Sequence, residues 1–363
     1  MLSMKLKMSF ENRAKKALIN SICTLLENNP EKNIPKIFKL SKTLAKDSAT
    51  QKILSDFEKY YEQIPSVKTY VDNSLMDINP QIKRTIFMNL MNKNTSSSDN
   101  DVKYLPVSAI LNSNNTCNLS CLNCNICNSK NNPLTYNDFD KVIKNIHKLE
   151  INSVILIGGE PFLLDFMLDI FENNKNIIFT PVTNGTLFTE KNSTRLLKSG
   201  NVVPIISLGN NELNNELNVD SNYGNGTYNK IITGMHLLKS KGIPFGTLTA
   251  VNSNNLSTVT SDQFVDSLIF NGSKFSIYSN SFCSNAPLNA SLTSKERNTL
   301  NEKINTFRST KPYFFIDLFN DTKYFRHLLN SDLAGKSSFI FSKMPFLTLQ
   351  SESLEKLLSH SFY

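Results

Sequence analysis

Four of the six cysteines in this 363-residue chain fall within one short run, at Cys117, Cys121, Cys124 and Cys127. Cysteines spaced this closely are typical of a metal site, because thiolates from one loop can converge on a single cluster. The first three follow the pattern C-x3-C-x2-C. This spacing lets three thiolates bind three irons of a [4Fe-4S] cluster and leaves the fourth iron open to a small molecule.

The same run can be divided in two other ways. Cys121, Cys124 and Cys127 form C-x2-C-x2-C, the spacing with which bacterial ferredoxins hold an electron-transfer cluster, but the chain has no distal Cys-Pro pair to complete that set. A zinc site is the third alternative, although structural zinc sites usually take their ligands as two spaced pairs. We favour the first division, in which Cys127 is a bystander or a spare ligand.

Two further groups contain residues suited to binding a ligand. Gly158-Gly159-Glu160-Pro161 follows an apolar run, and adjacent glycines at the end of a strand allow the backbone to approach a ligand closely. The carboxylate of Glu160 and the neighbouring carbonyls can receive an ammonium group, whereas the alternative is an ordinary tight turn. Thr183-Asn184-Gly185-Thr186 follows the next apolar run, and on its own this group is typical of an Asn-Gly turn.

Strand, loop and helix alternate in the part of the chain that carries these groups. Short runs of Val, Ile, Leu and Phe predict strands, and segments of helical period predict helices between them. This alternation predicts an α/β fold with a partial (βα)6 TIM-like barrel, whose working loops lie at the carboxyl ends of the strands. Thr135 and Asp138 resemble a capping box at the first of these helices. The expected strands are 106–111, 153–157, 177–182, 202–208, 245–251 and 274–278, with a further candidate at 313–318, and the expected helices include 139–149, 228–240 and 294–308.

The first hundred residues have a helical pattern throughout. Apolar residues recur at helical spacing in four stretches, and proline ends the first and third of them, at Pro30 and Pro65. Cys23 lies beside the first stripe, where we expect a buried thiol that packs as a small hydrophobe. The polar stretch 94–101 is the best linker candidate. We therefore expect three parts: an all-helical N-terminal domain with its linker at 1–101, the partial barrel at 102–290, and a C-terminal extension with a short helical tail at 291–363.

Composition predicts a soluble, cytoplasmic protein. No apolar run approaches the roughly 20 residues that a membrane-spanning helix needs, and the first ten residues lack the apolar stretch of a secretory signal. Clustered cysteines fit a metal site in a reducing compartment better than a disulfide framework. The net charge of +8 comes from lysines scattered along helical segments. We therefore expect neither nucleic acid nor a membrane as a partner.

Together, these motifs resemble the radical S-adenosylmethionine (radical SAM) superfamily, in the branch with a helical N-terminal extension and a SPASM-like C-terminal tail. The cysteine run after the first strand, Gly-Gly-Glu-Pro after the second and Thr-Asn-Gly after the third carry the resemblance. It covers about residues 12–320. It includes three further pieces, at 206–208, 224–228 and 260–264.

The resemblance implies two cofactors and the residues that bind them. Cys117, Cys121 and Cys124 would bind a [4Fe-4S] cluster, whose open iron would chelate the amino and carboxylate groups of S-adenosylmethionine. An electron, supplied by a partner such as flavodoxin or ferredoxin, would split the sulfonium, and the 5′-deoxyadenosyl radical would abstract hydrogen from a substrate that could be a peptide. The implied contacts are Gly158, Gly159 and Glu160 to the amino group and Asn184, Ser207 and Asn255 to the methionine or ribose.

Three departures from the family pattern leave two alternatives open. Gly209-Asn210 stands where relatives carry an acidic residue and glycine, and Ser253 stands where a basic residue is common. No cysteine follows Cys283, so the auxiliary cluster of a SPASM-like tail cannot form, and we expect a degenerate tail. The resemblance implies an oxidoreductase or modifying enzyme. The alternatives are a catalytically decayed binding protein of the same fold and a ferredoxin-like electron-transfer protein.

Overall fold

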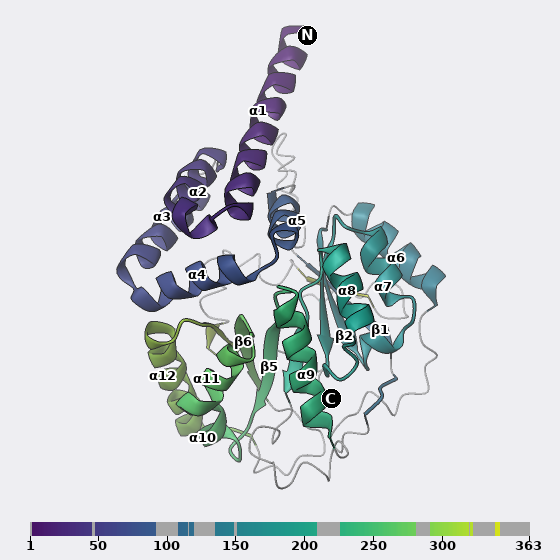
Figure 1. The fold of residues 1–363 in the computed structure, drawn as a ribbon, viewed down its shortest axis with the longest axis vertical. Helices are drawn as coiled ribbons and strands as arrows, with labels where there is room; N and C mark the ends of the chain where they lie inside the picture. Colours follow the sequence, from purple (N-terminus) through teal and green to yellow (C-terminus); the bar gives the residue numbers. More distant parts are fainter. Residues whose placement is uncertain are drawn as a thin grey trace.

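The computed structural model describes residues 2–45, 48–91, 108–114, 116–119, 135–148, 151–208, 226–280, 291–318, 320–321 and 338–341. These residues form an N-terminal group of helices and an α/β unit below it in Figure 1. The expected linker 94–101 and the cysteines from Cys121 onward lie outside the described residues.

The N-terminal part is helical, as predicted. Prolines begin three of its helices, at Pro30, Pro65 and Pro80, where the missing N–H costs no hydrogen bond. Pro65 follows the end of one helix, as expected, but it also begins a helix that the apolar pattern did not reveal. Cys23 is fully buried, as expected. The helices described here are α1 (Leu2–Glu27), α2 (Pro30–Leu44), α3 (Ser48–Gln63), α4 (Pro65–Asp77) and α5 (Pro80–Met91).

In the described part of the chain, eight parallel strands form one sheet in the order β7-β6-β5-β4-β3-β2-β1-β8. The six strands of the expected partial barrel and the additional candidate β7 are all present, and the two outermost strands of the described sheet are β7 and β8. Strand β8 was not predicted, and its backbone pairs with β1 from Ser108↔Ser338 to Leu111↔Phe341. The strands are β1 (Ser108–Asn114), β2 (Ser153–Gly158), β3 (Ile178–Thr183), β4 (Ile205–Leu208), β5 (Gly246–Val251), β6 (Phe275–Asn280), β7 (Phe314–Asp317) and β8 (Ser338–Phe341).

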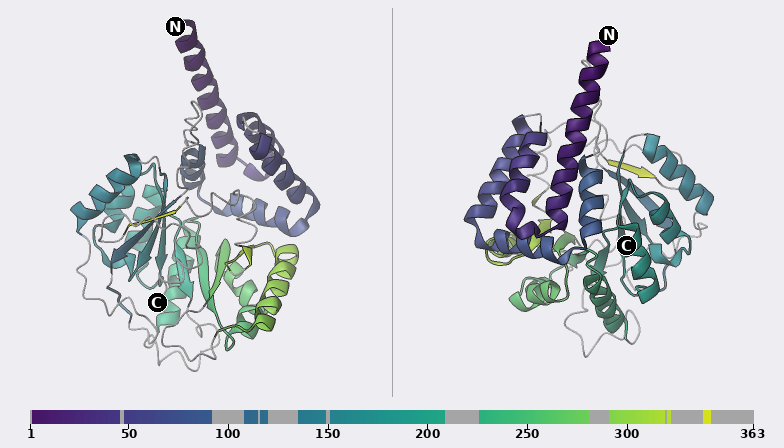
Figure 2. Two further views of the ribbon diagram at one scale, coloured as in Figure 1. Left: turned by 180° about the vertical axis from the view of Figure 1, so that it is seen from behind. Right: turned by 45° about the horizontal axis from the view of Figure 1, so that its top comes forward.

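Helices connect the strands and cover the outer face of the sheet (Figures 1 and 2). The predicted capping box at the first of them is confirmed, because Asp138 N lies 3.3 Å from Thr135 Oγ1 and Thr135 N lies 3.2 Å from Asp138 Oδ2. The expected helical tail lies outside the described residues. The helices are α6 (Tyr136–Lys148), α7 (Met167–Asn173), α8 (Glu190–Ser199), α9 (Thr227–Ser240), α10 (Leu256–Val259), α11 (Asp262–Phe270) and α12 (Ser294–Thr310), with a 3-10 turn, η2, at Pro161–Leu163.

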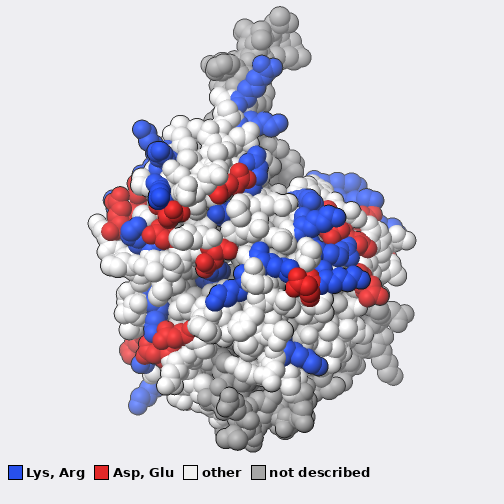
Figure 3. Space-filling model, viewed as in Figure 1, with Lys and Arg blue, Asp and Glu red and all other residues white. Residues whose placement is uncertain are grey.

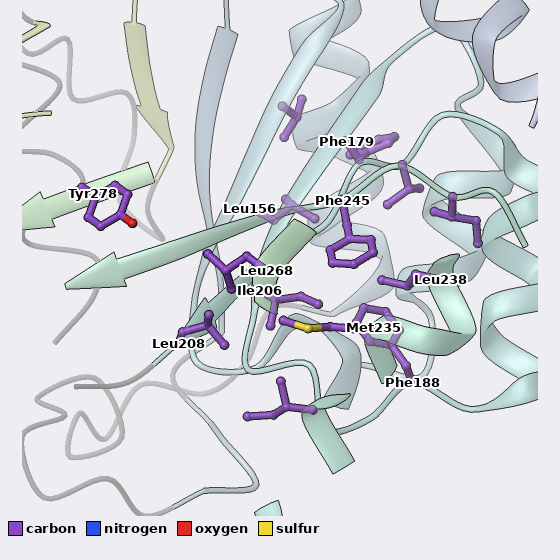
Figure 4. Close-up of a cluster of buried hydrophobic side chains, with 14 of the residues drawn as sticks. Leu156, Phe179, Phe188, Ile206, Leu208, Met235, Leu238, Phe245, Leu268 and Tyr278 are labelled. Atoms are coloured by element: carbon purple, nitrogen blue, oxygen red, sulfur yellow. The ribbon is translucent and has the colours of Figure 1, made fainter. Parts of the chain in front are cut away.

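Apolar side chains form one core on each face of the sheet. The larger core lies between strands and helices, where Phe179, Met235 and Phe245 are among the buried side chains (Figure 4). Alternation along each strand places neighbouring residues in different cores, so Ile206 belongs to the larger one and Ile205 to the smaller one. The smaller core fills the interior of the barrel with Ile110, Ile157, Val182, Ile205 and Leu248.

Helices α4 and α5 contact the amino-terminal ends of the barrel strands. Asn79 N donates to Gly242 O at 2.8 Å in the loop before β5, and Asn89 Nδ2 donates to Lys175 O at 2.9 Å in the loop before β3. Tyr70 stacks on Phe314, the first residue of β7, with ring centroids 6.4 Å apart. Figures 1 and 2 show α4 and α5 between the other N-terminal helices and the sheet. The helical part therefore covers the end of the barrel opposite the loops that carry the sequence motifs.

Charged side chains of both signs are interspersed on the face shown in Figure 3. Arg195 pairs with Asp169 at 2.5 Å and with Glu172 at 2.9 Å, and Lys311 pairs with two aspartates of α11. Among the described helices, none combines the length and the apolar character needed to cross a membrane.

Candidate functional site

Three of the sequence groups follow consecutive strands of the sheet, at their carboxyl ends. Cys117 follows β1, the glycine pair ends β2, and Asn184 follows β3. Because these strands are parallel and adjacent in the order β3-β2-β1, their carboxyl ends lie at one edge of the sheet. Of the three expected cluster ligands, Cys117 is within the described residues, whereas Cys121 and Cys124 are not.

The glycine pair lies directly against the segment that leads to Cys117. Gly159 N donates to Asn114 O and Glu160 N donates to Thr116 O, both at 2.8 Å. A Cβ atom would lie 1.9 Å from Thr116 O if placed on Gly159, and 2.3 Å from Asn112 Oδ1 if placed on Gly158, whose φ is +122°. Close passage of the two segments is therefore sufficient to require both glycines, whether or not a ligand also approaches them.

The carboxylate of Glu160 joins the second loop to the third. Its Oε1 accepts from Thr183 Oγ1 at 2.8 Å and from Phe162 N at 3.1 Å, and its Oε2 accepts from Asn184 N at 2.8 Å. The residue is 1% exposed. Burial raises the pKa of Glu160 to about 7, and the three hydrogen bonds oppose this rise. The side chain expected to receive an ammonium group thus binds donors of its own chain.

Asn184 joins the third loop to the cysteine segment. Its side-chain Nδ2 lies 3.5 Å from Cys117 Sγ and donates to Asn118 Oδ1 at 2.9 Å. The sulfur also accepts from Leu119 N at 3.4 Å. Cys117 is partly exposed, so its thiol is reachable at the edge of the described site.

The remaining two expected contacts lie on neighbouring elements. Ser207 is half-buried on β4, on the same side of the strand as the interior residue Ile205. Because Thr183 pairs with Ile206, Ser207 lies at the register position of Asn184, one residue further along the chain. Asn255 is 3% exposed, and its side chain accepts from Asn252 N and donates to Ala250 O, both at 2.8 Å. Asn255 therefore holds the turn after β5.

Sequence reasoning missed several residues that complete this network. Asn118 has no motif of its own, although its position next to Cys117 was a signal. Thr183 and Thr186 flank Asn184 within a recognised motif, so their hydroxyls could have been considered. Outside this network, Asp317 at the end of β7 is fully buried and accepts from Asn320 Nδ2 at 2.7 Å.

The described residues fit the two cofactors that the sequence resemblance implies. Two N–H groups directed at Cys117 Sγ are suited to a thiolate ligand, since such donors stabilise negative charge on sulfur. The Oδ1 atom of Asn114 is buried beside Gly159 and has no hydrogen-bond partner among the described residues. An unpaired acceptor at that position suits an ammonium donor. No group of three or more His, Cys, Asp or Glu gathers within the described part of the chain.

Comparisons with known proteins agree with this arrangement. The family model of the Radical SAM superfamily matches residues 111–268. An uncharacterized protein of Methanocaldococcus jannaschii is 36% identical over 181 residues, which are 46% of this chain and 59% of that protein. The cysteine-type anaerobic sulfatase-maturating enzyme of Clostridium novyi is 29% identical over 157 residues, covering 38% of this chain and 41% of the enzyme. The chain thus spans less than two thirds of the length of these curated relatives.

Solved structures show the same fold at low sequence identity. SuiB of Streptococcus suis bound to S-adenosylmethionine matches with a TM-score of 0.54 and 16% identity, over 89% of this chain and 78% of SuiB. SuiB bound to the precursor peptide SuiA matches with a TM-score of 0.53 and 15% identity, over 86% of this chain and 78% of SuiB. The part of the chain that carries the motifs, residues 111–268, therefore matches the radical SAM superfamily, and the SuiB structures share its fold.

Proposed function

We propose that this chain is an enzyme that uses a [4Fe-4S] cluster and S-adenosylmethionine to take a hydrogen atom from its substrate. When bound, these cofactors supply a 5′-deoxyadenosyl radical by one-electron cleavage of the sulfonium. The observation that carries the proposal is the hydrogen-bonded set of Cys117, Glu160 and Asn184, which joins three motif-bearing loops at the carboxyl ends of β1, β2 and β3.

The chain's own residues would divide the binding work as follows. Cys117, Cys121 and Cys124 bind the cluster. Gly158, Gly159 and Glu160 are the proposed contacts to the amino group of S-adenosylmethionine, and Asn114 Oδ1 adds an acceptor beside the Glu160 carboxylate, which already accepts three hydrogen bonds. Asn184, Ser207 and Asn255 are the other proposed cofactor residues. Of these three, Ser207 is the half-buried one that faces the barrel interior.

The barrel interior would protect the radical from water. Directly before the polar residues, the inner faces of the strands carry the buried apolar side chains of Ile157, Val182 and Ile205. An apolar layer under the site excludes solvent from below, and exclusion of solvent prevents quenching of a reactive intermediate. The helical part covers the amino end of the barrel, so substrate would enter from the carboxyl end.

A peptide is the substrate class that the comparisons favour. SuiB is described as bound to a precursor peptide, and one curated relative is a sulfatase-maturating enzyme. We extend the peptide class to this chain as part of the proposal. The proposal also includes domain boundaries at residues 101 and 290 and a degenerate SPASM-like tail. It further includes a cytoplasmic location and a flavodoxin or ferredoxin as electron donor.

The first test asks whether the cluster forms and where it is held. Anaerobically reconstituted protein should be brown, and addition of S-adenosylmethionine should change the electron paramagnetic resonance (EPR) spectrum of the reduced cluster. Cys117→Ala should abolish the cluster, whereas Cys127→Ala should retain it. The reverse result would support the ferredoxin-like alternative, and colourless or zinc-loaded protein would overturn the proposal.

The second test asks whether the chain is active. Reduced, reconstituted protein should release 5′-deoxyadenosine from S-adenosylmethionine, slowly even without substrate. Cys117→Ala provides the matched negative control. If the wild-type cluster forms but no 5′-deoxyadenosine appears with several reductants, the chain is the decayed binding protein and the proposed activity is wrong.

A further inference from the structure

Hydrogen bonds to both ends of the side-chain amide define how Asn184 is oriented. Its Oδ1 accepts from Thr186 N at 3.0 Å and from Thr186 Oγ1 at 2.7 Å. A backbone N–H can only donate, so the atom that faces Thr186 N must be the amide oxygen. The amide nitrogen therefore points the other way, toward Cys117 Sγ at 3.5 Å.

A closed ring of hydrogen bonds fixes this orientation. Asn184 Nδ2 donates to Asn118 Oδ1 at 2.9 Å, and Asn118 Nδ2 donates to Thr186 Oγ1 at 2.8 Å. Thr186 Oγ1 then donates to Asn184 Oδ1 and completes the ring. Each of the three side chains uses its donor and acceptor in only one consistent arrangement. The ring thus holds one N–H of Asn184 near the sulfur.

The backbone of Asn184 is fixed independently of this ring. Its N–H donates to Glu160 Oε2, on a side chain that is 1% exposed and also accepts from Thr183 Oγ1. The buried carboxylate thereby positions the backbone of the third loop, and the ring positions its side chain. The Glu160 carboxylate thus contacts the backbone N–H of Asn184, and the side chain of Asn184 contacts the sulfur.

We propose that Asn184 is a positioning residue that raises the reduction potential of the cluster by donating an N–H···S hydrogen bond to Cys117. This inference rests on the proposed function, because it requires the cluster to be bound by Cys117. Hydrogen bonds to ligand sulfurs withdraw negative charge and favour the reduced, more negative cluster. As a thiol, Cys117 can instead direct its S–H toward Asn118 Oδ1 at 3.9 Å, whereas a metal-bound thiolate can only accept.

The test is the midpoint potential of the reconstituted cluster, measured by anaerobic titration followed by EPR. Asn184→Asp keeps the oxygen that Thr186 needs and removes the N–H donor. It should lower the ratio of reduced to oxidised cluster at a fixed potential about tenfold, which is about 59 mV for a one-electron couple. Asn184→Ser removes the same amide donor without adding charge and should lower the ratio of reduced to oxidised cluster about threefold. This variant replaces Asn184→Asp in the test if the Asp variant binds little cluster.

Thr186→Val is the matched control. It removes a hydroxyl from the ring but leaves the amide of Asn184 and the backbone N–H of residue 186 in place, so the ratio should stay within twofold of wild type. Equal shifts in Thr186→Val and Asn184→Ser would mean that the ring only holds the loop, and would overturn the inference. An unchanged midpoint potential in both Asn184 variants would also overturn the inference. The proposed function would still stand in that case, provided that the wild-type protein binds its cluster. Failure of the wild type to bind a cluster would instead reject the proposed function.

Discussion

The two ends of the barrel are built from different kinds of contact. At the amino end, the helical part contacts the loops before the strands and the start of β7, as in the bond from Asn79 N to Gly242 O and the stacking of Tyr70 on Phe314. At the carboxyl end, a buried carboxylate, amides and a thiol bind one another through Glu160, Asn184 and Cys117. This difference agrees with the usual separation in parallel barrels between an end that stabilises the fold and an end that carries the chemistry.

The carboxyl end also retains features that do not favour stability. Glu160 is held in a site whose burial disfavours its charged form, and Asn114 Oδ1 is buried without a partner among the described residues. Groups of this kind cost free energy unless a ligand or a catalytic role compensates. The comparison therefore predicts that substitutions at the two ends will separate cofactor binding from stability.

Gly159→Ala should have the largest effect, and it should affect both properties. The new methyl group would overlap Thr116 O, so the segment leading to Cys117 must move away from β2. We expect a loss of about 3 to 4 kcal/mol in the free energy of unfolding, at the upper end of overpacking costs, together with loss of the cluster. Urea denaturation and iron content measure the two effects. A variant with wild-type stability would show that the two segments are not in close contact.

The pH dependence of stability should reveal Glu160. Its pKa is about 7 in the folded chain, against an ordinary value of 4.5 that applies when the chain is unfolded. Between these pH values the folded state keeps a proton that the unfolded state has lost, so the free energy of unfolding falls as the pH rises. The fall due to this group should be roughly 3 kcal/mol, fully developed above pH 7. The measurement is urea denaturation at pH 5 and pH 7.5.

Glu160→Gln is the control for that pH dependence, because glutamine does not titrate. The variant should lack the fall attributed to Glu160 and retain the pH dependence of all other groups. Parallel curves for wild type and variant would contradict the raised pKa. Parallel curves would also remove one difference between the two ends of the barrel, namely a buried carboxyl group whose titration changes stability.

Gly242→Ala should affect the amino end alone. Gly242 has φ of +64°, and a Cβ atom there would lie 2.8 Å from both Asn79 N and Asp77 O. Gly226→Ala is the matched control, because Gly226 has φ of +81° but no atom of the described residues lies within 4 Å of its Cβ position. Both variants should lose about 1 kcal/mol to backbone strain, and Gly242→Ala should lose about 1 kcal/mol more by overpacking. Reduced cluster content in Gly242→Ala would contradict the separation of the two ends.

Thr189→Ala should give the smallest change. Thr189 and Asn192 form a capping box at the start of α8, at the carboxyl end of the barrel but outside the Asn184 ring. Loss of the cap should cost about 1 kcal/mol in thermal or urea denaturation. Cluster content should stay at the wild-type value. If Thr189→Ala lowered the yield of coloured, cluster-containing protein, cluster binding would depend on the overall stability of the carboxyl end of the barrel.

Much of the fold could be predicted from the sequence because its strands are apolar runs set between helices of clear period. The capping box at Thr135 and the burial of Cys23 were also predictable, since both depend on local pattern. Helix α4 was missed because Pro65 was interpreted only as an end, although proline is equally suited to the first position of a helix. Strand β8 was missed because it lies within 291–363, where the sequence led us to expect a C-terminal extension with a short helical tail.

The site was predictable as a set of loops but not as a set of contacts. Strand order brings the loops together, so the grouping of Cys117, Gly159 and Asn184 followed from parallel topology. The partners of Glu160 depend on a register shift between Asn112 and Asn114 and on the bend of the chain after β2, which residue types do not reveal. For the same reason, a carboxylate expected to contact a ligand proves to be bound by Thr183 and Asn184.

The pairing of β8 with β1 has a consequence for biosynthesis. Strand β1 leads directly to Cys117, yet the partner for its outer edge is at residues 338–341, near the other end of the sequence. During translation, that edge stays exposed after the rest of the sheet can form, and an exposed strand edge is a template for intermolecular pairing. Chaperone demand and aggregation of nascent chains should therefore persist until β8 has left the ribosome and can pair with β1.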